Sequence, residues 1–245
     1  MPRPHPQPGI GAGIEHSAPH KAAGLRPRSV RTAAGLVLGA LAAAGVSVAA
    51  AATIAVKVLT ADGKALPDTI VMLHALDAPS RPSPPVAAVM DQINLAFAPD
   101  LLVIPVGSTV SFPNTDTTSH QIYSFSPTHR FQLPLYRGKP YPPEHFDKAG
   151  LVTLGCNIHD NMVAYILVTD APLFGRTDGT GTWAASALAR GRYRVELWHP
   201  RLREDAAALT REVSIGDERA ELSIRLAKSL RPPPLAGRPH SWDAY

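Results

Sequence analysis

The chain has 245 residues, of which 25 are proline and 18 are glycine, and 45% of its residues are hydrophobic. This length allows one or two globular domains, and so many prolines and glycines indicate frequent turns rather than long helices. The formal charge of +4 comes from residues 1–52, because the rest of the chain has equal numbers of basic and acidic residues. A neutral remainder lacks the basic footprint of DNA- and RNA-binding proteins, so no nucleic-acid partner is expected.

Residues 1–52 are typical of a secretion signal peptide. A basic stretch that ends at Arg31 precedes an uncharged run rich in alanine over residues 33–48, and Ala49–Ala52 offers several A-x-A cleavage sites. An uncleaved membrane anchor is the alternative, but a stable span favours Leu, Ile and Phe over the Ala and Gly found here. The chain is therefore predicted to be exported to the periplasm, with no stable membrane insertion after cleavage.

After this leader, the chain shows short β-rich runs separated by Gly, Pro and Asp. The strands expected up to residue 125 are Thr53–Leu59, Thr69–His74, Val86–Met90, Asn94–Ala98, Leu101–Pro105, Ser108–Phe112 and Gln121–Phe125. Prolines suggest that residues 126–150 make a surface excursion, with one short strand at Glu144–Asp147. Leu151–Gly155 and Met162–Val168 follow as strands. Because no run shows a helical stripe, we expect an all-β sandwich over residues 53–170.

A second, smaller β-sandwich is expected over residues 171–228. Within Gly191–Trp198, apolar and charged residues alternate with the period of a half-buried strand. Glu212–Ile215 and Ala220–Leu226 would complete a hairpin around Gly216. A unit this small has a marginal core when it stands alone. The tail over residues 229–245, which contains a run of three prolines, is expected to be disordered.

Cys156 is the only cysteine, and it begins the run C-x2-H-x2-M that continues with His159 and Met162. A thiolate, an imidazole and a thioether are the ligand set of a mononuclear blue-copper centre. Such a centre needs a second imidazole, and His120 follows the predicted strand Ser108–Phe112 closely enough to supply it. An odd thiol in an oxidising compartment invites oxidation unless a metal occupies it. An inert, buried cysteine is the simpler alternative.

The short loop between Leu151–Gly155 and Met162–Val168 would place Cys156 and His159 in one plane, with Met162 as a long axial ligand and His120 completing the set. We interpret the chain as an electron carrier rather than an enzyme, because it has neither a G-x-S-x-G elbow nor a C-x-x-C-H haem site. Zinc seldom recruits Met. Two alternatives stay open: a copper delivery or storage protein, and a metal-free carbohydrate-binding or adhesion sandwich.

Four further histidines and two acidic residues have less specific patterns. His74, His129, His145 and His199 show no spacing that implies shared coordination, so surface or packing roles are preferred. Asp116 and Asp160 flank the expected ligands, and both are interpreted as turn or cap residues rather than as ligands.

The segment from Ala96 to Val168 resembles the cupredoxins, the group of plastocyanin and amicyanin. The residues that carry the likeness are Phe97-Ala-Pro99, Gly107, Asn114, Asp116 and His120, followed by the short ligand loop at residues 156–162. The resemblance implies a Greek-key cupredoxin fold, one copper ion that cycles between Cu(I) and Cu(II), and a role in electron transport. One departure is Gln121, because an Asn commonly follows the first histidine in that group and orients the ligand loop.

The whole chain is also similar to bacterial proteins of methylamine utilisation. The runs that carry this likeness are Met90–Gln92, Tyr123–Ser126, 131–138, 155–162 and Trp198–Pro200. The second unit resembles the small transthyretin-like or carboxypeptidase-regulatory sandwiches. These resemblances imply a redox protein as partner, either an exported dehydrogenase or a c-type cytochrome.

Overall fold

The computed structural model describes residues 52–79, 81–138, 140–216 and 218–232. The predicted signal peptide, apart from Ala52, and the tail beyond residue 232 lie outside these residues. The described chain consists of strands and one short helix, α1 (Ala206–Leu209), which confirms the all-β prediction. Among the described residues, no helix is long and apolar enough to cross a membrane.

Two sheets from the middle of the chain pack around one core. The larger sheet has the strand order β6 (Leu101–Pro105), β12 (His159–Thr169), β11 (Gly150–Cys156), β8 (His120–Ser124), β9 (Phe131–Tyr136). The smaller sheet has the order β10 (Glu144–Phe146), β7 (Ser108–Ser111), β3 (Ala87–Val89). Alternate residues of these strands point inward, as the period of two requires. We call this unit the central sandwich.

The core of the central sandwich extends to the end of β11. Ile122, Val152, Leu154 and Cys156 all belong to its buried cluster. Along β11 and β8, the intervening residues Gly155 and Tyr123 face the opposite side of the sheet. Cys156 is therefore a core residue of its strand, and its side chain points to the inside of the sandwich.

The remaining strands form a second pair of sheets with a separate core. One sheet has the order β14 (Thr182–Leu188), β1 (Ala52–Leu59), β17 (Ala220–Arg225). The other has the order β13 (Leu173–Arg176), β2 (Ile70–Ala75), β15 (Gly191–Trp198), β16 (Arg211–Ile215). Its buried cluster combines apolar residues of β1 and β2 with those of β15, β16 and β17. We call this unit the split sandwich.

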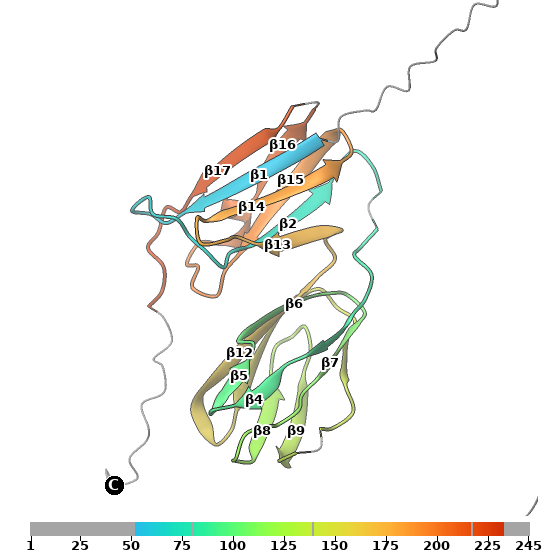
Figure 1. The fold of residues 1–245 in the computed structure, drawn as a ribbon, viewed down its shortest axis with the longest axis vertical. Helices are drawn as coiled ribbons and strands as arrows, with labels where there is room; N and C mark the ends of the chain where they lie inside the picture. The colour runs from blue at the N-terminus through green and yellow to red at the C-terminus, as the bar shows by residue number, and fades with distance from the viewer. Residues whose placement is uncertain (1–51, 80, 139, 217, 233–245) are drawn as a thin grey trace, which may run out of the picture. The chain divides into compact units, whose positions relative to one another are not determined.

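The pairing of β1 and β2 differs from the sequence prediction, which grouped both strands with the central sandwich in residues 53–170. β1 pairs with β14 and β17, and β2 pairs with β13 and β15. Figure 1 shows this directly, since the blue and cyan strands β1 and β2 stand among the orange and red strands from the end of the chain. The second sandwich is thus assembled from two separated segments, and the central sandwich is inserted between them.

Two further elements of the central sandwich differ from expectation. Residues 91–98 form the hairpin β4 (Asp91–Ile93) and β5 (Ala96–Ala98), joined by Asn94 and Leu95, which both have positive φ angles of 53° and 58°. This is the conformation of a two-residue hairpin turn. Residues 131–136, expected to lie in a surface excursion, form β9 because Phe131, Leu133 and Tyr136 pack into or against the core.

Candidate metal centre

Three of the four predicted ligands meet at one end of the central sandwich. His120 begins β8, Cys156 ends β11, and His159 begins β12. The turn between β11 and β12 has only two residues, so Cys156 and His159 face each other as the last pair of the hairpin. His120 reaches them from the neighbouring strand, because β8 pairs with β11.

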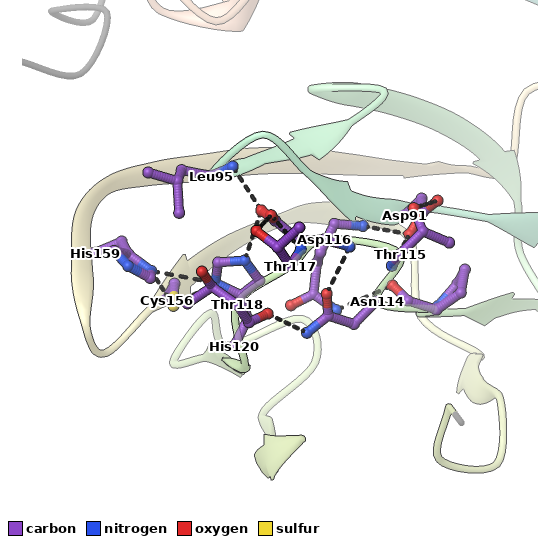
Figure 2. A network of polar contacts seen from close by, with 12 residues as sticks. Asp91, Leu95, Asn114, Thr115, Asp116, Thr117, Thr118, His120, Cys156 and His159 are labelled. Atoms are coloured by element: carbon purple, nitrogen blue, oxygen red, sulfur yellow. Dashed lines mark hydrogen bonds and ion pairs between the residues drawn. The ribbon is translucent and has the colours of Figure 1, made fainter. Parts of the chain in front are cut away.

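The potential ligand atoms of these three residues lie close together. The Nδ1 atoms of His120 and His159 are 3.1 Å apart, and the Cys156 Sγ atom lies 3.9 Å and 3.7 Å from them, respectively. Among the described residues, this is the one group of three such side chains whose ligand atoms lie within 4.8 Å of one another. Figure 2 shows the three side chains converging from two separate loops.

These spacings fit a single metal ion. Metal–nitrogen bonds near 2.0 Å and metal–sulfur bonds near 2.3 Å in a trigonal plane would separate two nitrogens by about 3.5 Å, and nitrogen from sulfur by about 3.7 Å. The observed triangle has nearly these edges. Two imidazoles and a thiol are also the donor set that suits copper.

The site is shielded from water on most sides. His120 is 0% exposed, Cys156 is 3% exposed, and Met162 is 1% exposed. Met162 follows His159 on β12 and belongs to the same buried cluster as Cys156. Its role as an axial ligand, like the ligand roles of the other three residues, remains a prediction.

Asp116 holds the ring of His120 from the side opposite the cluster. Its Oδ2 atom lies 3.0 Å from Nε2 of His120 and accepts a hydrogen bond of 2.7 Å from the main-chain N–H of Leu95. These donors, Leu95 first and His120 second, keep the pKa of Asp116 well below its usual range. A carboxylate at Nε2 favours the tautomer that carries its proton there, which leaves Nδ1 free to bind a metal.

His159 differs in its environment, since it is only partly buried. Burial and the neighbouring His120 both lower the pKa of His159. A lowered pKa favours the neutral imidazole, which is the form that binds a metal ion.

The β4–β5 hairpin fixes the loop that leads to His120. Gln92 exchanges main-chain hydrogen bonds with Pro113, Thr115 and Asp116. The side chain of Asp91 accepts hydrogen bonds from Thr115, and Asn114 donates to the carbonyl groups of Thr118 and Tyr136. Figure 2 shows this network running from Asp91 to His120. The position of His120 thus depends on contacts that reach well beyond the cluster.

The sequence pattern identified Asp116 as a turn residue, and the structure adds a second role. Its Oδ1 atom accepts the N–H of the next residue, Thr117, and its other oxygen contacts His120. The spacing of four residues between an acidic residue and a buried histidine could have indicated this contact. The anchoring by Gln92 had no such signal, because it depends on a hairpin that the sequence did not reveal.

Three other described histidines contact neighbours outside the cluster. His129 pairs with Glu144 at 3.1 Å and stacks near Phe146, while His74 lies 3.8 Å from Glu196. Nδ1 of His199 accepts the main-chain N–H of Arg201. None of these residues belongs to the cluster of three described above.

No protein-family profile matches the chain, and no curated protein matches it. Among solved structures, similar chains include a purple cupredoxin from Nitrosopumilus maritimus, with 24% identity over 34% of this chain and 99% of that one, at a TM-score of 0.30. A mutant of amicyanin in its reduced Cu(I) form has 22% identity over 34% of this chain and 82% of its own, at 0.31. A copper-containing nitrite reductase from Thermus scotoductus has 25% identity over 39% of this chain and 25% of its own, at 0.33. Likeness at this level assigns no function, so the function has to be inferred from the side chains of the site.

Proposed function

We propose that this chain is an exported mononuclear copper protein that carries single electrons between redox partners. The observation that carries the proposal is the convergence of two imidazole Nδ1 atoms and one thiol sulfur within 3.1 to 3.9 Å, in the interior of a β-sandwich. His120, Cys156 and His159 would hold the ion, and Met162 would be the fourth ligand. Copper bound in this way supplies one-electron chemistry between Cu(I) and Cu(II).

The protein would contribute a site whose ligand positions change little between the Cu(I) and Cu(II) states. His120 is fixed by Asp116, and Asp116 is fixed by the β4–β5 hairpin. Cys156 is held in the core at the end of β11. Because these ligands are positioned before the metal arrives, little reorganisation accompanies electron transfer. Burial of the thiol also protects it from oxidants in the exported protein.

The redox partner proposed from the sequence is an exported dehydrogenase or a c-type cytochrome, with methylamine utilisation as the wider context. An electron carrier needs only to receive one electron and release it to another protein. The proposal therefore assigns no substrate turnover to this chain.

The test is the spectrum of the purified full chain loaded with Cu(II). We expect an intense thiolate-to-copper absorption band in the visible range that disappears on reduction, together with the narrow copper hyperfine splitting of a blue-copper site in electron paramagnetic resonance. A colourless adduct that does not change with redox state would favour copper delivery or storage. A chain that takes up no copper would leave a metal-free binding sandwich.

A further inference from the structure

A cavity of about 340 Å³ lies at the end of β15, where the run Trp198-His199-Pro200 leaves the strand. Glu204 and Arg231 also line this cavity, and none of the four candidate metal ligands does. Small-molecule sites have volumes of about 300 to 1,000 Å³, so the space suits a small ligand. We call it the Trp198 cavity.

One part of the wall of the Trp198 cavity is apolar and aromatic. Trp198 contacts Tyr165 of β12 in an edge-to-face arrangement, with ring centroids 5.8 Å apart. Three leucines, Leu151, Leu197 and Leu202, also line the space. An aliphatic or aromatic group gains free energy when it leaves water for such surroundings. This part of the wall therefore favours a ligand with an apolar side chain.

His199 offers a hydrogen-bond donor at the cavity. It is 8% exposed, and its Nδ1 atom accepts the main-chain N–H of Arg201 over 3.1 Å. Burial first, and the charge of Arg201 second, lower the pKa of His199, which favours the neutral ring. Because Nδ1 accepts a hydrogen bond, the proton of the neutral ring is on Nε2. Nε2 has no hydrogen-bond partner among the described residues, so its N–H is available to an acceptor in the cavity.

Glu204 brings a negative charge to the same wall. Its Oε1 atom accepts the main-chain N–H of Lys228 over 2.7 Å, whereas its Oε2 atom is buried and has no partner among the described residues. Burial opposes ionisation, but the main-chain N–H groups of Lys228 and neighbouring residues outweigh it and lower the pKa of Glu204. A buried carboxylate oxygen without a donor is costly, so a donor on a ligand would stabilise it.

Arg231 adds a positive charge that Glu204 does not neutralise. The main-chain N–H of Arg231 donates to the carbonyl of Arg201 over 2.8 Å, and Nε of Arg201 donates back to the carbonyl of Arg231 over 2.6 Å. These two bonds fix the backbone of Arg231. Its guanidinium group makes no hydrogen bond or ion pair within the described part of the chain. The cavity wall thus carries two opposite charges that do not pair with each other.

These three polar groups determine which ligand chemistry fits. A simple anion would be attracted by Arg231 and His199 but repelled by Glu204. A simple amine would pair with Glu204 but meet the charge of Arg231. A molecule that has both a carboxylate and an ammonium group satisfies all three side chains, because a carboxylate accepts readily from a guanidinium group and an imidazole N–H.

We propose that the Trp198 cavity binds a free α-amino acid with an apolar side chain. The carboxylate of the amino acid accepts hydrogen bonds from Arg231 and His199, and its ammonium group donates to Glu204. Its side chain lies against Trp198 and the leucines of the wall. Binding forms no covalent bond and uses none of the candidate metal ligands, so this site is separate from the proposed copper function.

The first test is isothermal titration calorimetry of the metal-free full chain with L-leucine and L-phenylalanine. Two analogues of leucine separate its charges: 4-methylpentanoate lacks the amino group, and isopentylamine lacks the carboxylate. Each analogue should bind at least tenfold more weakly than leucine, since each loses a charged hydrogen-bonding group. The proposal is overturned if neither amino acid binds, if leucine and both analogues bind alike, or if methyl α-glucoside binds in their place.

Two variants assign the charges to residues. Glu204→Gln keeps an acceptor for the N–H of Lys228, and it should weaken leucine binding roughly tenfold without weakening 4-methylpentanoate. Arg231→Gln should weaken leucine to a similar extent without weakening isopentylamine. Asp205→Asn and Arg203→Gln are the matched controls, because they make the same charge changes at exposed residues outside the cavity wall. Equal losses in the controls would overturn the assignment to the cavity.

The position of the ligand is read from the indole N–H signals of the tryptophans in NMR spectra. The chain has three tryptophans, and Trp198→Phe identifies the signal of Trp198 by its disappearance. Leucine should shift this signal in proportion to the fraction of protein bound. A shift confined to another tryptophan would place the amino acid elsewhere and overturn the proposal.

Discussion

The two segments that carry the candidate ligands are held in place by different contacts. The first is the loop Asn114–Ser119, which leads to His120, and the second is the turn between Cys156 and His159. The first is tied down by side-chain and main-chain hydrogen bonds from Asp91, Gln92 and Leu95. The second is a two-residue turn whose ends are set by the β11–β12 ladder. His120 is thus fixed by tertiary contacts and is fully buried, whereas His159 lies at a hairpin end and is partly open to solvent. The comparison suggests a site with one rigid side and one accessible side.

The largest effect is expected from Cys156→Ser, which removes the sulfur that both loops surround. The copper-loaded variant should lose the visible thiolate band completely, because a hydroxyl group supplies no comparable charge-transfer transition. The metal-free variant should keep its far-ultraviolet circular dichroism spectrum, since Ser is nearly isosteric with Cys. A variant that retained the band would move the metal to other ligands.

The pair His120→Gly and His159→Gly tests the rigid and accessible sides directly. Without metal, His120→Gly should lower the free energy of unfolding by about 2–4 kcal/mol, because it leaves a cavity and removes one of the partners of the Asp116 carboxylate. His159→Gly should cost less than about 1 kcal/mol, since its ring is partly exposed. Urea titrations measure both values.

Added imidazole tests the accessibility of the His120 and His159 positions in the copper-loaded variants. It should restore the visible band of His159→Gly, whose vacant ligand position opens toward solvent, but not that of His120→Gly, whose position is enclosed. Equal rescue of the two variants would contradict the difference in access between the two histidines.

Asp116→Asn should weaken copper binding by about 10- to 100-fold, because loss of the carboxylate removes the group that orients His120. Asp160→Asn is the control, since Asp160 is exposed and lies two residues from Met162, so its loss should change copper affinity little. Competition with a chelator of known affinity measures both. If the two variants behave alike, the contact between Asp116 and His120 has no positioning role.

A modest effect on stability is expected where the hairpin is anchored, at Gln92. Its Nε2 atom donates to the carbonyl of Pro113 and to the hydroxyl of Tyr136. Gln92→Leu should lower the free energy of unfolding by about 1–2 kcal/mol, because it removes two hydrogen bonds that usually contribute about 1 kcal/mol each. Tyr136→Phe removes the shared contact from the other side, and the double variant should lose less than the sum of the single ones. Full additivity would show that this bond does not stabilise the loop.

The cluster of candidate ligands could be predicted from the sequence to the extent that it depends on local spacing. Cys156, His159 and Met162 follow one another in the chain, and the hairpin that carries them needs only a short turn. His120 was inferred from its place after a strand, and the structure brings its Nδ1 atom to the other two residues. The hairpin at residues 91–98 was missed because Asn94 and Leu95 adopt left-handed conformations that Leu seldom takes.

The pairing of β1 and β2 could not be predicted for a different reason. Their residues alternate like those of any half-buried strand, and nothing in this pattern specifies a partner about 120 residues later in the chain. Strand β9 was missed because Pro134 favours a loop. There, burial of Leu133 and Tyr136 outweighs the local preference, and Pro134 is an exposed residue on an edge strand, where proline is tolerated.

The insertion of the central sandwich has a consequence for synthesis of the protein. β1 and β2 leave the ribosome first, but every strand that pairs with them follows residue 172. Strands of residues 87–169 pair only among themselves within the described chain, so they can close their own sheets while β1 and β2 still present open edges. Such long-range closure is slow, and unpaired edges attract other chains until it is complete. A chain truncated after residue 170 should therefore aggregate through its first two strands, even where its metal ligands are all present.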